Sequence, residues 1–97
     1  MQLTRHARQR ARQRSIPTDV LDVLYAYGTA QHVGGAVSYT LDRTARRLAC
    51  EDDRRLGARL DGYSGCYIVI GDGERAVTVA RRARRFRAEG RRRPALA

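Results

Sequence analysis

Apolar residues recur at helical spacing at the very start of the chain. Leu3, Ala7 and Ala11 fall on one side of a helix when residues are placed at 100° intervals. This pattern predicts a helix over residues 4–14, with Thr4 as its N-cap. These three residues fall within one arc of about 80°, which forms the apolar side of the predicted helix.

Two further stretches have the same helical period. Residues 18–27 are predicted to form a second helix, capped by Thr18 and ended by Gly28. Residues 43–60 are predicted to be helical as well, and we expect the acidic residues 51–53 together with Gly57 to divide this stretch into two pieces.

Three short segments have the composition of strands. Residues 36–41 alternate between larger apolar and smaller or polar side chains, and residues 67–70 are continuously apolar, as expected of a central strand. Residues 71–74 predict a hairpin turn, after which residues 76–80 return beside the preceding strand. The predicted order is therefore helix, helix, strand, helix, strand, strand.

This order predicts an α+β fold. We expect the two N-terminal helices to pack on a small antiparallel β-sheet, with a further helical segment between the first strand and the C-terminal hairpin. Residues 1–87 are expected to form a single domain, and residues 88–97 an arginine-rich, mobile tail, because they offer little apolar surface to bury.

The composition argues against a membrane-spanning protein and against several kinds of binding site. The chain has 97 residues, and no apolar run approaches the roughly 20 residues that span a bilayer. Cys50 and Cys66 are too few for a disulfide framework or a structural zinc site, and no Gly-rich phosphate loop is present. We therefore expect a cytoplasmic protein with no metal, no cofactor and no membrane partner.

Positive charge is concentrated at the two ends of the chain. The net charge is +10, yet residues 15–80 contain seven arginines and nine acidic residues. Residues 1–14 contain five arginines and no acidic residue, and residues 81–97 contain eight arginines and one acidic residue. Clustered charge of this kind is typical of contact with a nucleic acid, although a solvated surface is an alternative.

All twenty cationic residues are arginine. The codon usage of a GC-rich bacterial genome explains the absence of lysine but does not explain the clustering. Guanidinium groups also suit nucleic acids, because they form paired hydrogen bonds with phosphate and stack on bases.

The sharpest local feature is a row of three residues on the first predicted helix. His6, Arg10 and Arg14 are spaced four residues apart beside the apolar arc, so we expect the imidazole to be partly enclosed and close to arginines. Such a group can bind phosphate or move a proton during RNA cleavage, in which the RNA supplies its own 2′-hydroxyl nucleophile. The alternative is structural, with His6 capping or packing the helix while Arg10 and Arg14 pair with Asp19, Asp22 or Asp52.

The remaining arginines near the two ends are candidate phosphate contacts. On the first helix, Arg5, Arg8 and Arg12 point away from the apolar side, toward solvent, whereas Arg14 belongs to the row beside that side. The arginines after the last strand follow one another closely. The candidates for nucleic-acid binding are Arg5, Arg8, Arg12, Arg14, Arg81, Arg84, Arg85 and Arg87.

The opening residues resemble a family of small bacterial domains of unknown function. Residues 4–16 follow its pattern Thr-x-His-Ala-x-x-Arg-x-x-x-Arg-Gly-Ile, except that Ser15 replaces the glycine. Residues 78–82, Thr-Val-Ala-Arg-Arg, are similar to its closing Thr-Val-x-His-Arg, with Arg81 in the place of the histidine. The resemblance covers about residues 3–87.

That family is similar to RelE-like toxins and to the broader barnase/EndoU/colicin/RelE group of ribonucleases. The resemblance implies helices preceding an antiparallel sheet, and a toxin of a toxin–antitoxin pair that acts on RNA. It also implies RNA, free or on the ribosome, and an acidic antitoxin protein as partners. His6 and Arg10 match the opening motif and Arg82 matches its closing arginine, so these three are the candidate catalytic residues.

Two functions remain open from the sequence. The first is a RelE-like, metal-independent endoribonuclease that acts through a basic cleft, which the His6/Arg10 row favours. The second is a non-catalytic module whose arginine-rich ends bind a nucleic acid or an acidic partner, which the replacement of the closing histidine by Arg81 favours.

Overall fold

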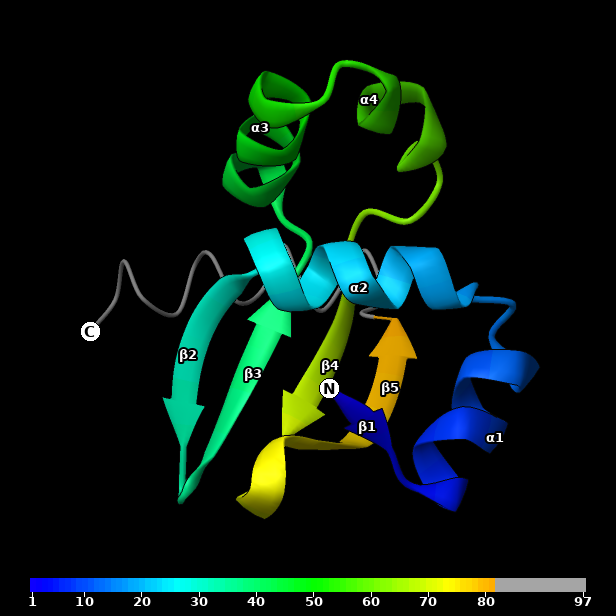
Figure 1. Ribbon diagram of the computed structural model, residues 1–97, viewed down its shortest axis with the longest axis vertical. Coiled ribbons are helices and arrows are strands. Elements are labelled where there is room, and N and C mark those ends of the chain that lie inside the picture. Colours follow the sequence, from blue (N-terminus) through cyan, green and yellow to red (C-terminus); the bar gives the residue numbers. More distant parts are fainter. Residues whose placement is uncertain (82–97) are drawn as a thin grey trace, which may run out of the picture.

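The fold is described by a computed structural model, which defines residues 1–81. Four helices and a five-stranded sheet make up this part of the chain (Figure 1). In chain order the elements are β1 (Gln2–Leu3), α1 (Arg5–Gln13), α2 (Thr18–Tyr27), β2 (Thr29–Val33), β3 (Ala36–Thr40), α3 (Arg43–Asp52), α4 (Arg55–Arg59), β4 (Cys66–Ile70), the short 3-10 helix η1 (Asp72–Glu74) and β5 (Arg75–Arg81). The α+β class predicted from the sequence is confirmed.

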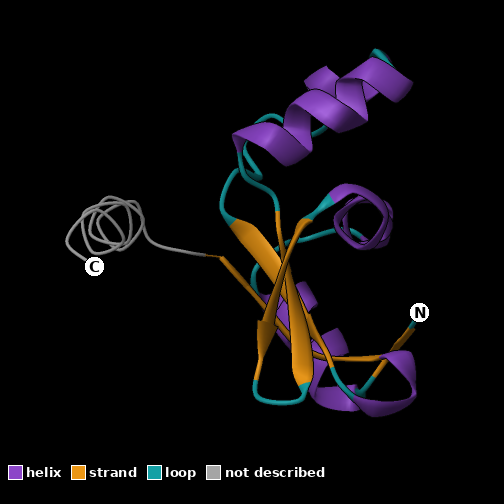
Figure 2. Cartoon of the chain, turned by 90° about the vertical axis from the view of Figure 1, so that its left-hand side faces the viewer, coloured by secondary structure: helices purple, strands orange, loops and turns teal. Residues whose placement is uncertain are grey.

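The sheet has the strand order β1-β5-β4-β3-β2, so β4 lies at its centre, as its continuous apolar sequence predicts. Helices α1 and α2 lie on one face of the sheet, where α1 packs along β5 and α2 packs on β3 and β4. Helices α3 and α4 lie beyond one end of the strands (Figure 2). No helix of the described residues covers the opposite face.

The first helix forms as predicted. The Thr4 side chain caps it, because its Oγ1 accepts a hydrogen bond of 3.1 Å from the Ala7 amide. Of the helix residues only Ala7 and Ala11 are buried. Because these side chains are small, α1 lies close against β5 and leaves its other residues at the surface.

The cap predicted for the second helix is wrong. Thr18 is the first helical residue, and Pro17 occupies the N-cap position without a side-chain hydrogen bond. Proline suits this place because it has no amide hydrogen to satisfy. Gly28 ends the helix as predicted, and a Cβ there would lie 2.4 Å from the Leu24 carbonyl oxygen.

The predicted order of strands is incomplete. It lacks β2, which pairs with β3 in an antiparallel hairpin through the turn at Gly34 and Gly35. Both glycines have positive φ, 44° and 81°, as the tight turn between two strands requires. All five residues of β2 are exposed, so no alternation of buried and exposed side chains marks this strand in the sequence.

The sheet is also mixed rather than purely antiparallel. The two residues of β1 pair in parallel with the start of β5, while the other neighbouring strands are antiparallel. A two-residue strand gives no periodic signal, so it could not be predicted from the sequence.

The long predicted helix after β3 is divided at the acidic residues, as expected, but not at Gly57, which lies within α4. Asp42 caps α3 by accepting a hydrogen bond of 2.9 Å from the Ala45 amide, and α3 ends at Asp52. Asp53 has extended backbone angles, and α4 follows from Arg55. The core is formed mainly by one side of α1 and α2 and by the sheet face that they cover; its largest fully buried side chains are Leu21, Leu24, Leu41, Leu60, Ile68, Val20, Val79 and Cys66.

Candidate nucleic-acid interface

The arginines of α1 are exposed and have no acidic partner among the described residues. The first acidic residue of the chain is Asp19, so no carboxylate lies within α1 itself. The ion pairs of the described residues involve other arginines, namely Arg47 with Glu51, Arg55 with Asp53 and Arg59 with Asp19. The positive charge of α1 is therefore free to attract an anion from solution.

The row of His6, Arg10 and Arg14 lies at the surface. His6 is exposed, so the prediction of a partly enclosed imidazole is wrong. The reason is that α1 buries only Ala7 and Ala11, and one buried arc of two alanines is too narrow to enclose a side chain on its flank.

The structural alternative for this row also differs from what is observed. Thr4, and not His6, caps α1. Arg10 and Arg14 form no ion pair with described acids: Asp19 is bound by Arg59, and Asp52 accepts a hydrogen bond of 2.5 Å from the Tyr27 hydroxyl.

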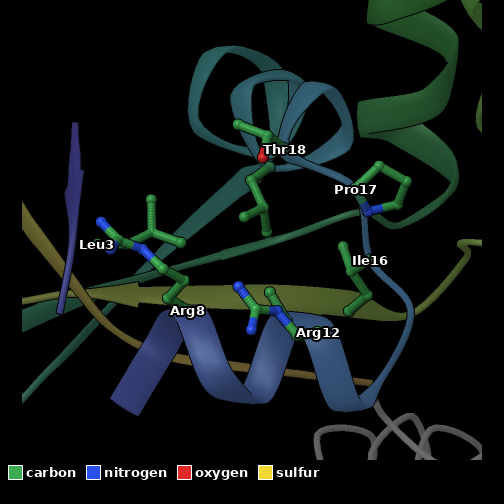
Figure 3. Close-up of a pocket in the computed structure, with 8 residues that line it drawn as sticks. Leu3, Arg8, Arg12, Ile16, Pro17 and Thr18 are labelled. Atoms are coloured by element: carbon green, nitrogen blue, oxygen red, sulfur yellow. The ribbon is translucent and has the colours of Figure 1, made fainter. Parts of the chain in front are cut away.

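Arg8 and Arg12 line a hollow between α1 and the start of α2. Its volume is about 420 Å³, and Figure 3 shows both side chains extending from α1 into the space between this helix and α2, with Arg8 next to Leu3. Both arginines are exposed, as predicted, but they face this hollow rather than only bulk solvent. The hollow is lined by Leu3, Arg8, Ala11, Arg12, Ile16, Pro17, Thr18 and Leu21.

The chemistry of this hollow is mixed. Ala11, Ile16 and Leu21 are buried apolar residues, whereas the guanidinium groups and the Thr18 hydroxyl supply polar groups. A ligand with a flat apolar part and an anionic part, such as a nucleotide, matches such a lining.

A second group of basic residues begins beside this hollow. Arg59 of α4 binds Asp19, the neighbour of Thr18, through two hydrogen bonds of 2.6 Å and 2.7 Å from Nε and Nη2. The hydrogen bonds with Arg59 lower the pKa of the Asp19 carboxyl. This pair holds α4 against the start of α2.

Arg59 and Arg81 both lie against the ring of Tyr63. Their guanidinium carbons are 5.8 Å and 5.7 Å from the ring centroid, within the range of cation–π contact. Arg81 is the last residue of β5 and is paired in register with Cys66 of β4. Burial raises the pKa of the Cys66 thiol, and the nearby Arg81 opposes this rise.

We call the residues that these contacts connect the arginine band, in which Asp19 links the hollow to Arg59. It comprises Arg8, Arg12, Thr18, Asp19, Arg59, Tyr63 and Arg81. The band joins the basic first helix to the basic end of the last strand, which are far apart in the sequence.

Arg46 adds a further positive charge beside the band. Its Nη1 donates a hydrogen bond of 3.2 Å to Oγ of Ser64, the neighbour of Tyr63. Its Nε is buried and has no hydrogen-bond partner among the described residues.

Sequence reasoning missed Arg46, Arg59 and Tyr63. Arg59 lies forty positions from Asp19, and only the tertiary fold brings them together. The only signal in the sequence was an arginine, Arg59, four residues before Tyr63. This spacing by itself does not indicate a binding site.

Several predicted site residues lie outside the described part of the chain. They are Arg82, Arg84, Arg85 and Arg87, and so is the predicted tail at residues 88–97. The three candidate catalytic residues are therefore represented here by His6 and Arg10, which lie one turn apart on α1.

Two further observations apply to residues 1–81. In this part of the chain, no three His, Cys, Asp or Glu side chains gather where a metal ion could bind. None of its helices has both the length and the apolar character needed to cross a membrane.

Comparison with known proteins gives no match for this chain. No family model matches the sequence, no curated protein matches it significantly, and no solved structure is significantly similar to the fold.

Proposed function

We propose that this protein binds RNA through α1 and the arginine band. The observation that carries the proposal is the difference between two sets of arginines. Arg47, Arg55 and Arg59 are paired with acids of the domain, whereas the four arginines of α1 and Arg14 at its C-cap have no acidic partner in residues 1–81. Unpaired guanidinium groups gathered on one helix fit a partner that carries regularly spaced negative charge.

The chemistry around the band supports single-stranded RNA as this partner. Guanidinium groups bind phosphate, and exposed aromatic and guanidinium planes stack on unpaired bases. The band offers guanidinium planes at Arg8 and Arg12 beside the apolar lining of the hollow, and two further guanidinium groups lie against the ring of the half-buried Tyr63. A duplex presents only its phosphates to such a surface, so we expect it to bind more weakly.

This proposal is tested by fluorescence anisotropy with a labelled single-stranded RNA. The double variant Arg8→Gln/Arg12→Gln removes two unpaired arginines of the hollow, and we expect affinity to fall on the order of tenfold. The matched control Arg47→Gln/Arg55→Gln removes two arginines that are paired with acids. Equal losses in both variants would mean that net charge, and not the band, determines binding.

The second candidate function is RNA cleavage by a RelE-like, toxin-type mechanism. It is favoured by the exposure of His6 and Arg10 one turn apart on α1, where a phosphodiester can reach both side chains. His6 would accept the proton of the 2′-hydroxyl as its oxygen forms a bond to phosphorus, and Arg10 would stabilise the charge that develops on the phosphorus oxygens. The bond from phosphorus to the 5′-oxygen would break, and the leaving oxygen would take a proton from water. This candidate includes the acidic antitoxin and the ribosome as expected partners.

Cleavage is tested by incubating the protein with RNA alone and with ribosomes. If His6 is the base, His6→Ala should lower the rate by roughly 10²-fold or more and leave RNA affinity unchanged. His32→Ala is the control, because His32 is the other histidine of the chain and is also exposed. Should the wild-type protein cleave neither substrate, the catalytic candidate is wrong while RNA binding still stands.

A further inference from the structure

The outer edge of β2 is an unprotected strand edge. All five residues of β2 are exposed, and β2 is the last strand of the sheet, paired only with β3. Figure 1 shows no described element beyond it. Its outward amide and carbonyl groups are therefore open to a further strand.

Within residues 1–81, the usual protections of a sheet edge are missing from β2. Natural edges are shielded by charged side chains, prolines, bulges or a covering element. Residues 23–41 contain no Asp, Glu, Lys, Arg or Pro, and β2 pairs with β3 in an unbroken register. The opposite edge differs, because β1 has only two residues and leads directly into α1.

We propose that a second copy of this chain adds to this edge, with the two β2 strands antiparallel and Gln31 opposite the partner's Gln31. Alternate side chains of a strand point to opposite faces, so Thr29, Gln31 and Val33 share one face. A pairing centred on Gln31 sets Thr29 opposite the partner's Val33. The two sheets then form one sheet, in which the helix-covered faces of both copies lie on the same side. Val33, which is 56% exposed, gains a neighbour in this arrangement.

The distribution of charge fits a second copy. A net charge of +10 opposes self-association, but the unpaired arginines of α1 lie beside β5, at the far side of the sheet. With strands about 4.8 Å apart, the two β5 strands of the dimer would be separated by seven spacings, or roughly 34 Å. This distance is several times the Debye length of about 8 Å at physiological ionic strength, so repulsion between the two α1 helices is screened.

An acidic partner is a poorer fit for this edge. Such a partner would gain nothing from β2, which has no charge to pair with, and would be drawn to α1 instead. The dimer edge and the arginine band are separate surfaces, so the proposed dimer does not depend on RNA binding.

Sedimentation velocity over a range of concentrations, from low micromolar to hundreds of micromolar, tests the dimer. The variant Gln31→Lys would set two like charges opposite one another, and we expect its dissociation constant to rise several-fold. Gln9→Lys makes the same chemical change at an exposed position of α1 and should dimerise like the wild type. A mixture of Gln31→Lys and Gln31→Glu should restore association.

Three outcomes would overturn the proposal. They are a wild-type protein that stays monomeric at every concentration, a Gln31→Lys variant that dimerises as well as Gln9→Lys, and a mixture of the two charged variants that does not associate. Circular dichroism of each variant establishes that it is folded, which is expected because Gln31 is exposed.

The register is tested by disulfide formation. Directly opposed residues of antiparallel strands have Cα atoms about 4.5–5.5 Å apart, within the span of a disulfide. Gln31→Cys should therefore form a covalent dimer on mild oxidation, whereas Gln9→Cys should not. Failure of Gln31→Cys to cross-link in a protein that still dimerises would show that the register centred on Gln31 is wrong.

Discussion

The two edges of the sheet are both exposed, yet they differ in every chemical respect. Beside β1 and β5 lies α1, whose four arginines have no acidic partner among the described residues. At the other edge lies β2, in a stretch that has no formal charge at all. Exposure by itself therefore does not define a binding surface. The chemical groups exposed at each edge determine the kind of partner that it suits. The arginines of α1 suit a polyanion, and the uncharged β2 edge suits another strand.

The arginines likewise differ in role although all of them carry the same charge. Arg59 binds Asp19 with short hydrogen bonds and holds α4 against α2, so part of its role is structural. Arg8 and Arg12 hold no other element in place and line an open hollow. An arginine count from the sequence cannot separate these two roles, because the separation depends on which acids the fold brings near.

The largest expected effect is the difference in salt dependence between the two edges. With six or more phosphate contacts, RNA affinity should fall on the order of 10³-fold between 50 and 200 mM salt, because bound cations are released from the RNA. Dimerisation through the uncharged β2 edge should change little over the same range. Fluorescence anisotropy measures RNA affinity and sedimentation velocity measures dimerisation, both in the same series of buffers. An RNA affinity that does not change with salt would contradict an electrostatic interaction between RNA and α1.

A smaller effect is expected from a change at the start of the uncharged edge. Gly28→Ala would place a methyl group 2.4 Å from the Leu24 carbonyl oxygen and 2.9 Å from Tyr39 Cβ. We expect the free energy of unfolding to fall by about 1–3 kcal/mol, measured by urea denaturation.

Gly71→Ala is the matched control for this change. A Cβ at Gly71 would lie 3.5 Å from Val77 Cγ1, an ordinary contact, so this variant should remain close to the wild type in stability.

In the folded fraction of Gly28→Ala, self-association should weaken more than RNA binding. Equal weakening of both would show that the two edges are not independent.

The smallest expected effect concerns the paired arginine of the band. Hydrogen bonding to Arg59 lowers the pKa of Asp19, so the pair stabilises the fold above about pH 4 and this contribution is lost as the pH falls through the lowered pKa. The Asp19 side chain is 57% exposed, which limits the effect to about 1 kcal/mol or less.

Thermal melting across this acidic range measures the contribution. Asp19→Asn should flatten the dependence of melting temperature on pH, whereas Asp22→Asn, which removes an exposed carboxylate of the same helix, should not. Identical pH profiles for the two variants would contradict a stabilising role of the Asp19–Arg59 pair.

Elements that bury one side were predictable from the sequence. Helices α1 and α2, the division between α3 and α4, and the central position of β4 all follow from apolar periodicity and from capping or ending residues. Strands β1 and β2 were not predictable. The first has two residues, and the second buries none of its side chains, so neither leaves a periodic pattern.

The candidate site also has features that the sequence predicts and features that it does not. The concentration of arginine in residues 1–14 was evident from the sequence, and so was the helix that carries it. The place of Arg8 and Arg12 beside a hollow was not, because the hollow exists only where α1 meets the start of α2. The exposure of His6 likewise depends on how narrow a face α1 buries against β5.

The sequence alone thus determined the local structure, the α+β class and the accumulation of positive charge, because each depends on residues that are close together in the chain. The tertiary structure alone decided which arginines are paired, how Arg59, Tyr63 and Arg81 meet, and that β2 forms an open edge. These features depend on contacts between segments that are distant in the sequence. Such contacts form only when the apolar sides of the helices and the sheet are buried against one another.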